Sequence, residues 1–329
     1  MRWLACYCML ASMPDITVLD ISPQPSGPQP ANLLAGSALP PGVRPDYNSP
    51  KELAVLLESM GFAMQKRFGQ NFLVNQGARQ RLFKLLALPG SDQPPPRCWE
   101  IGPGFGAMTA LALDAGLDLS AFEIDHGFAR FLTDVYGSLP TFRLYEGDFL
   151  ATWRRARAEQ PAPDCIFGNL PYNVASAMIA ALLEGGLTPP RMVFTIQKEA
   201  AERMTAKPGD KDYSSFTVLC HSLYRVRKAF DLSAGMFWPQ PRVVSSVVAM
   251  ELRADAPSCA GDKKFTRFTR SAFAARRKTL RNNLKASGIA EAAFDAAVES
   301  LGLAPDVRAE RLSVEQLASL FQLLEQAGR

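Results

Sequence analysis

Residues Asn169 to Tyr172 read Asn-Leu-Pro-Tyr and follow the apolar run 165–167, which is typical of a buried strand. Such a break predicts a turn, and doubly wound sheets bind ligands at the carboxyl ends of their strands. Pro171 lacks an N–H and favours an extended Leu170, which leaves the Leu170 carbonyl beside the Asn169 side-chain oxygen. Two acceptors at one point match the two N–H bonds of a planar amino group, and the Tyr172 ring offers a face to a flat heterocycle. Together they suit the exocyclic amine of adenine. The alternative is a simple turn, with Asn169 as a helix cap and Tyr172 in the core.

A second candidate site lies upstream, where Glu100-Ile-Gly-Pro-Gly-Phe-Gly106 predicts a strand-to-helix turn. Glycines there allow close backbone approach to a ligand in front of a helix N-terminus. Glu123, 21 residues after Gly102, ends the next strand and suits ribose hydroxyls, whereas Asp148 ends the third and suits an adenine amine. A helix cap near Asp125 and a common Gly-Asp turn are the alternatives. Because the spacing also fits a dinucleotide site, an NAD-linked oxidoreductase is a competing hypothesis.

The elements that must position these groups alternate along the middle of the chain. Strands are expected at 98–101, 119–124, 142–145, 164–168, 192–196, 225–230 and 243–251, with helices at 106–115, 126–136 and 174–184. This order predicts an α/β fold with a mostly parallel sheet of about seven strands, the last pair antiparallel. The ends at residues 102, 123, 148 and 169 then share one edge of the sheet.

The beginning of the chain has a different character. Residues 1–48 are rich in Pro and Gly and predict a disordered leader that buries nothing, with a mis-assigned start codon as one explanation. Ser49-Pro50 predicts a helix start and Gly61 its end. A basic and aromatic loop, 66–73, and a helix over 76–87 follow. Beyond the first residues, no apolar run approaches the roughly 20 residues of a membrane span.

Cysteine and histidine usage favours a reducing cytoplasm without a metal site. The six Cys show no paired spacing, and Cys98 and Cys165 lie inside predicted buried strands. The two His are far apart in the sequence and have no Cys-x-x-Cys motif near them, so no metal is expected.

The end of the chain predicts helices only, with apolar residues at helical spacing from Phe265 to Leu284 and further helices near 291–301 and 313–326. Nine Lys or Arg and no Asp or Glu lie between Lys263 and Lys285, at positions 263, 264, 267, 270, 276, 277, 278, 281 and 285. A solvated helix face usually alternates its charges. On a chain of net charge +4 this run therefore favours a polyanion as partner. We expect a domain at 49–255 and a helical domain at 256–329 that binds this polyanion.

Taken together, these motifs resemble the rRNA adenine N6,N6-dimethyltransferase family, of the bacterial small-subunit (16S) type (KsgA/RsmA), from about residue 50 to 321. The similarity rests on five motifs: Phe-Gly-Gln-Asn-Phe-Leu (68–73), Glu-Ile-Gly-Pro-Gly-x-Gly (100–106), Glu-Ile-Asp (123–125), Gly-Asp (147–148) and Asn-Leu-Pro-Tyr-Asn (169–173). It continues in Gln-Lys-Glu-Ala-Ala-Glu-Arg (197–203), Phe-x-Pro-x-Pro with Val243 and Ser245, and Arg-Arg-Lys-Thr-Leu-Arg-Asn-Asn-Leu (276–284). Asn75 and Val244 depart from the usual family residues.

The resemblance implies a Rossmann-like, S-adenosylmethionine-dependent methyltransferase. It implies catalytic roles for Asn169, Leu170, Pro171 and Tyr172, and cofactor binding by Asn71, Leu73, Gly102, Glu123, Asp148 and Asn169. RNA contacts are expected from Arg276, Arg277, Lys278, Arg281 and, as a second ring on the target base, Phe237, for which the alternative is ordinary core. The expected activity is dimethylation of two adjacent adenosines near the 3′ end of small-subunit rRNA.

Partner, compartment and alternatives follow from the same resemblance. The expected substrate is rRNA in a pre-assembled small subunit, and the expected enzyme is a cytoplasmic monomer. Gly69 and Leu170 favour the small-subunit type over the large-subunit methylases of antibiotic resistance, which are similar. A non-catalytic ribosome-assembly factor is the remaining alternative, because binding and catalysis would use the same basic surface.

Overall fold

The computed structural model describes residues 42–60, 70–88 and 94–327. Some sequence predictions concern residues outside these ranges: the leader up to residue 41, the helix end at Gly61, and the part of the basic and aromatic loop before Gln70, with Lys66, Arg67 and Gly69. Among the described helices, none is both long enough and apolar enough to cross a membrane.

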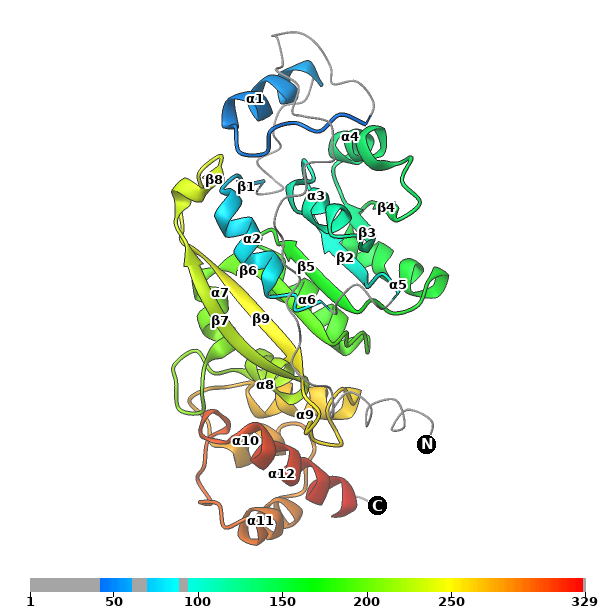
Figure 1. Ribbon diagram of the computed structural model, residues 1–329. Helices are drawn as coiled ribbons and strands as arrows, with labels where there is room; N and C mark the ends of the chain where they lie inside the picture. The colour runs from blue at the N-terminus through cyan, green and yellow to red at the C-terminus, as the bar shows by residue number, and fades with distance from the viewer. Residues whose placement is uncertain (1–41, 61–69, 89–93, 328–329) are drawn as a thin grey trace. The chain divides into compact units, whose positions relative to one another are not determined.

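The main sheet has seven strands in the order β4-β3-β2-β5-β6-β9-β7 (Figure 1). They are β2 (Arg97–Ile101), β3 (Asp118–Glu123), β4 (Phe142–Glu146), β5 (Cys165–Asn169), β6 (Arg191–Gln197), β7 (Tyr224–Leu232) and β9 (Ser245–Leu252). The pairs β2–β3, β2–β5, β3–β4 and β5–β6 are all parallel. The predicted seven-stranded α/β fold is confirmed, and the antiparallel orientation of the last pair stays a prediction.

The register of the parallel strands brings their carboxyl ends to one edge. Ile101 lies opposite Phe122 on one side and Gly168 on the other, and Glu123 lies opposite Glu146. The loops that follow β2, β3, β4 and β5 therefore start within a residue or two of the same level.

Burial explains why these segments form strands. Nearly every residue of β2, β3, β5 and β6 is buried, as expected for parallel strands covered on both faces. In the end strand β4, by contrast, only two of the five residues are buried. The loops that follow β2, β3 and β5 therefore emerge from the ends of strands that are held in the buried centre of the sheet.

Eight helices of the described chain precede β7, and several begin with side-chain caps. They are α1 (Pro50–Ser59), α2 (Gln76–Lys84), α3 (Ala107–Asp114), α4 (His126–Tyr136), α5 (Phe149–Glu159), α6 (Ala175–Glu184), α7 (Lys198–Thr205) and α8 (Ser215–Leu223). Ser49 caps α1 as predicted, and Asn75 caps α2 by accepting from the Ala78 amide at 2.8 Å. The departure at Asn75 therefore keeps a capping group. Helices α5, α7 and α8 were not among the predicted elements.

The segment 42–48 corrects the predicted leader. Tyr47 is buried, and its hydroxyl lies 2.6 Å from the hydroxyl of Tyr136 on α4. The prediction that residues up to 48 bury nothing is wrong for this part, because one aromatic side chain after a Pro-rich stretch carries no periodic signal.

The structure also pairs two of the cysteines. Cys98 and Cys165 lie opposite each other on β2 and β5, with Cα atoms 4.8 Å apart, and form a disulfide. Cys220 and Cys259 are free and buried. The sequence shows no paired spacing for these cysteines, because the strand register and not the sequence spacing brings the two side chains together.

The chain divides into two compact units. The first contains Met1–Ala175, Pro189–Lys198 and Ala229–Ala249, and the second contains Ser176–Thr188, Glu199–Lys228 and Met250–Arg329. In the second, α8 joins α9 (Lys263–Ala272), α10 (Leu280–Lys285), α11 (Glu291–Ser300) and α12 (Val314–Ala327). Phe265, Phe268, Leu280 and Leu284 are buried in its core, as their helical spacing predicts. The functional division at residues 48 and 255 stays a prediction.

Candidate functional site

The glycine-rich loop after β2 needs glycine for two physical reasons. Gly102 and Gly104 have φ angles of 69° and 55°, which side chains other than glycine rarely adopt. A Cβ on Gly104 would also lie 2.7 Å from a ring carbon of Phe72. Phe72 belongs to β1 (Phe72–Leu73), which pairs with β8 (Phe237–Trp238) in a separate two-stranded sheet. The glycine-rich loop thus packs directly against Phe72 of β1.

Glu123 joins the end of β3 to this loop. Its carboxylate accepts a hydrogen bond from the Gly104 amide at 3.0 Å and one from the Asp125 amide at 2.9 Å. Burial raises the pKa of Glu123 to about 7. Asp125, and not Glu123, caps α4, because its side chain accepts from the amide of Gly127 at 2.9 Å. Glu123 is therefore a buried carboxyl that is not used to cap the helix.

Asp148 lies next to this group at the end of β4. The Gly147 amide donates to the Glu123 carbonyl at 2.8 Å, which holds the two strand ends together. One carboxylate oxygen of Asp148 caps α5 by accepting from the Leu150 amide at 2.9 Å. The side chain is exposed, so capping occupies one oxygen and leaves the other for a ligand.

The Asn169 amide is oriented by the backbone of the segment that contains Asn71. Its Nδ2 donates to the Asn71 carbonyl at 2.6 Å. Because a carbonyl only accepts, this bond fixes which end of the amide is nitrogen and leaves Oδ1 as an acceptor. The predicted acceptor role of Asn169 is thus compatible with the geometry, and Asn71 contributes through its main chain.

Leu170 and Pro171 hold the loop that follows. The Leu170 amide donates to the Thr195 carbonyl at 3.0 Å, and its side chain is buried. The Pro171 carbonyl accepts from Val174 and Ala175 at the start of α6. Among the described residues, no group donates to the Leu170 carbonyl, so it remains an acceptor beside Asn169.

Tyr172 has a partner that sequence reasoning did not assign. Its hydroxyl lies 2.5 Å from the hydroxyl of Ser245, which is fully buried at the start of β9. The phenol is therefore held at its outer end while the ring stays half-buried. The only sequence signal for Ser245 was its place in the Pro-x-Val-x-Ser pattern.

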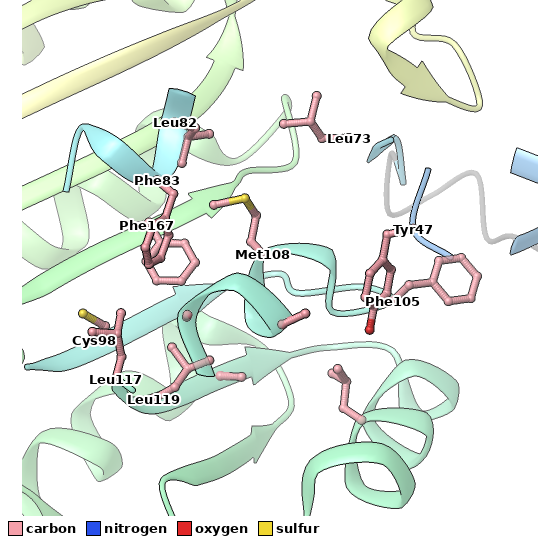
Figure 2. Packing of buried hydrophobic residues seen from close by; sticks show 14 of the residues in the cluster. Tyr47, Leu73, Leu82, Phe83, Cys98, Phe105, Met108, Leu117, Leu119 and Phe167 are labelled. Carbon is pink, nitrogen blue, oxygen red and sulfur yellow. The ribbon is translucent and has the colours of Figure 1, made fainter. Parts of the chain in front are cut away.

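A pocket in the first unit brings several predicted residues together. Leu73, Gly102 and Asn169 all line it, and so does Tyr47 from the segment thought to be disordered. In Figure 2, Tyr47 and Phe105 are drawn at one end of the surrounding apolar cluster. Glu123, Asp148 and Asn71 are not lining residues, but the contacts described above connect them to the loops that are.

Glu100 also lines this pocket and was quoted in the sequence only as part of the glycine motif. It is buried, and the Thr109 hydroxyl donates to its carboxylate at 2.6 Å. Burial and, to a smaller degree, the negative charge of Glu123 raise the pKa of Glu100 to about 8. A positively charged ligand group in the pocket would favour the ionised form of this carboxyl.

Phe237 does not present its ring to a substrate. It lies opposite Leu73 in the β1–β8 pair, is 2% exposed and belongs to the main apolar core. The expectation that it stacks on the target base is wrong, and the core alternative holds. Its pattern, Phe-x-Pro-x-Pro, specifies a strand-and-loop geometry equally well.

The predicted RNA-binding cations lie in a turn and not on a continuous helix. Arg276, Arg277 and Lys278 are exposed between α9 and α10. The buried Asn283 side chain closes this turn by donating to the carbonyls of Ala272 at 2.7 Å and Ala275 at 3.1 Å. These three residues are hereafter called the basic turn.

Acidic residues from elsewhere in the second unit neutralise part of the basic run. Four of its nine cations form ion pairs: Lys264 with Glu325, Arg270 with Glu184, Arg281 with Asp295 and Glu291, and Lys285 with Glu291. The basic run is therefore not a continuous stretch of unpaired positive charge. Within the described chain, the basic turn, Lys263 and Arg267 form no ion pair, and all five are exposed.

Comparison with known proteins identifies relatives that are similar over most of this chain. The family model for ribosomal RNA adenine dimethylase matches residues 61–326. A protein of Treponema denticola named ribosomal RNA small subunit methyltransferase A is 42% identical over 286 residues, covering 85% of this chain and 96% of the relative. One of the same name from Borreliella burgdorferi is 39% identical over 239 residues, covering 73% and 82%.

Solved structures are similar in fold. A dimethyladenosine transferase from Plasmodium falciparum superposes with a TM-score of 0.62 at 23% identity, covering 77% of this chain and 97% of the other. The 23S rRNA methyltransferase ErmE gives 0.57 at 22% identity, covering 77% and 99%. These two likenesses support the Rossmann-like architecture.

Proposed function

Because the chain belongs to the ribosomal RNA adenine dimethylase family, we propose that it dimethylates N6 of two adjacent adenosines in a loop near the 3′ end of 16S rRNA, with S-adenosylmethionine as methyl donor. The observation that carries this proposal is the orientation of Asn169. Its Nδ2 is bound to the Asn71 carbonyl, and its Oδ1 is left to accept beside the carbonyl of Leu170.

The residues at the strand ends fit the cofactor. The Gly102–Gly104 backbone can approach a ligand closely, and Leu73 and Asn169 line the same pocket. We assign the ribose hydroxyls to Glu123 and the adenine amine of the cofactor to the free oxygen of Asp148. When bound, S-adenosylmethionine supplies an electrophilic methyl group on a positively charged sulfur.

The chain's own task is to make the target amine nucleophilic. The lone pair of N6 is delocalised into the adenine ring, so the amine must become pyramidal before it reacts. Asn169 Oδ1 and the Leu170 carbonyl accept its two N–H bonds, which favours the pyramidal form and stabilises the positive charge that develops on nitrogen. The methylated nitrogen is a strongly acidic cation, and it loses one proton to solvent without needing a strong base. The N–H that remains keeps one of the two acceptors as its partner, so a second transfer uses the same residues.

The target base must leave its stack to reach these acceptors. Tyr172 provides a ring on one face, with its hydroxyl anchored on Ser245. The basic turn supplies phosphate contacts, which position RNA without reading its sequence. Arg281 contributes less than the sequence predicts, because two acids already neutralise it.

We further propose a pre-assembled small subunit as substrate, a monomeric enzyme and a cytoplasmic location. The match to the family leaves the oxidoreductase hypothesis without support. The large-subunit and assembly-factor alternatives become outcomes of the test below.

The deciding experiment incubates the protein with labelled S-adenosylmethionine and small subunits purified from cells that lack this activity. We expect label in two neighbouring adenosines near the 3′ end of 16S rRNA, and much slower labelling by the control variant Asn169→Ala. Label in large-subunit rRNA would establish the alternative substrate. Tight subunit binding without any label would establish the assembly factor.

A further inference from the structure

The segment 42–48 forms part of the wall of the cofactor pocket. Tyr47 lines the same pocket as Leu73, Gly102 and Asn169, and its side chain is only 8% exposed. Neither the motifs nor the family resemblance assigns this residue a role.

A buried arginine on α2 joins this segment to β1. Arg79 is 4% exposed and donates to the carbonyls of Leu73 at 2.8 Å and Tyr47 at 3.3 Å, and to the Asn48 side-chain oxygen at 2.7 Å. Among the described residues it forms no ion pair with a carboxylate. Burying a guanidinium is costly unless its N–H groups are satisfied, so these acceptors and the arginine hold one another in place. Tyr47 and Leu73, two residues of the pocket wall, thus share one donor.

A second set of contacts holds the other end of the Tyr47 side chain. Its hydroxyl bonds to that of Tyr136 at 2.6 Å. The Arg44 guanidinium lies 5.1 Å from the centre of the Tyr136 ring and pairs with Asp114 at 2.6 Å. The position of Tyr47 is therefore determined by α2 on one side and α4 on the other.

The lining residues indicate which half of the cofactor meets Tyr47. The proposed partners of the adenosine half, Glu123 and Asp148, do not line the pocket, whereas Asn169 of the methyl-transfer loop does. Glu100, a buried carboxyl suited to a cationic group, lines it as well. The pocket that contains Tyr47 is therefore the methionine side of the site.

We propose that the Tyr47 side chain contacts the methionine half of the bound cofactor and that Arg79 positions Tyr47 and Leu73 for this contact. The inference rests on the proposed function for the identity of the cofactor. An aromatic face beside a sulfonium or ammonium group contributes a cation–π attraction. Arg79 is a positioning residue, since it reaches the pocket only through its two carbonyl partners.

The test compares two ligands that differ in the methionine half. Calorimetry with full-length protein measures binding of S-adenosylmethionine and of 5′-deoxy-5′-methylthioadenosine, which lacks the amino-acid portion and the positive charge. We expect Tyr47→Leu to weaken S-adenosylmethionine binding about 3- to 30-fold, the range of a cation–π contact, and to leave methylthioadenosine binding unchanged. Tyr47→Phe, which keeps the ring, should retain most of the affinity.

Arg79→Met is tested against Arg81→Met, a matched change at an exposed position of the same helix. We expect Arg79→Met to raise the KM for S-adenosylmethionine with little change in kcat, and Arg81→Met to change neither. Thermal unfolding with and without ligand separates loss of the fold from loss of binding.

Two results would overturn the inference. One is equal weakening of both ligands by Tyr47→Leu, and the other is wild-type affinity of this variant for both. If the wild-type protein binds S-adenosylmethionine but modifies no adenosine, the proposed reaction fails while the assignment of Tyr47 is still decided by binding alone. If Tyr47→Leu does not fold, Tyr47→Phe decides the question. This variant keeps the ring, so loss of its preference for S-adenosylmethionine over methylthioadenosine would overturn the proposed ring contact.

Discussion

The edge of the sheet where β2 to β5 end, which we propose as the cofactor site, and the basic turn hold their charged groups in different ways. At the edge, Glu100 and Glu123 are buried, and hydroxyl and amide donors hold their oxygens at 2.6 to 3.0 Å. In the basic turn, the side chains are exposed, and only the backbone is fixed, through Asn283. A reaction at one atom needs fixed geometry, whereas attraction of a polyanion needs mainly free charge.

The largest expected effect concerns the Asn169 amide. Asn169→Ala removes one preorganised acceptor for the amine and should lower the methylation rate by roughly 10² to 10³. RNA affinity should stay unchanged, because the basic turn is intact. Single-turnover methylation together with filter binding measures both, with Asn282→Ala as an exposed control. Equal turnover in the Asn169 variant would remove this residue from the mechanism.

Removal of the Glu123 carboxylate should have the next largest effect. Glu123→Ala is expected to weaken S-adenosylmethionine binding by about 1.5 to 3 kcal/mol, the range for hydrogen bonds to a charged group. It also frees the Gly104 amide, so part of the loss comes from the glycine loop. Calorimetry checks this result, and the wild-type protein should not bind NAD. NAD binding without any response to S-adenosylmethionine would contradict the cofactor assignment.

Glu100 should make the ligand-free protein less stable as pH rises. Its pKa is about 8 in the folded state and near 4.5 when exposed. Between these values the folded state holds a proton that the unfolded state has released, so the free energy of unfolding falls as pH rises from about 4.5 to about 8. Below this window both states are protonated and the effect vanishes. Glu100→Gln should reduce the total decrease in the free energy of unfolding over this pH range by on the order of 1 to 3 kcal/mol.

Denaturant unfolding at several pH values measures this difference. Glu123 also lowers the free energy of unfolding as pH rises, up to its own pKa of about 7. The Glu100→Gln variant should therefore keep part of the decrease in stability with pH. Identical pH profiles for the variant and the wild type would show that Glu100 ionises normally.

The smallest effect per residue is expected at the basic turn. Changing Arg276, Arg277 and Lys278 together to Ala should reduce the slope of log affinity against log salt by roughly 2 to 3 units, near one per phosphate contact. S-adenosylmethionine affinity should not change. Arg281→Ala is the control. It should change the salt slope less than the loss of a basic-turn residue does, because Asp295 and Glu291 already neutralise that cation. A wild-type salt slope in the triple variant would exclude the basic turn as the RNA-docking surface.

Local sequence determined the strands of the main sheet and the residue types of the loops that follow them. The strands from β2 to β6, the cap at Ser49 and the placement of Glu123 and Asn169 at strand ends all follow from apolar runs, turn residues and helix signals. These signals act within a few residues, and the parallel order of a βα alternation then brings the strand ends to one edge. The roles of the site residues remain predictions that the experiments above test.

Tertiary structure alone decided which residues meet across long sequence separations. The Asn71 carbonyl orients Asn169, Ser245 holds Tyr172, and Phe237 becomes core through pairing with β1. Acids outside the basic run cancel part of its charge, and Tyr47 joins a pocket built from later residues. The periodicity of a sequence records which face of an element is buried. It does not record which distant side chain fills the neighbouring space, so these contacts could be read only from the fold.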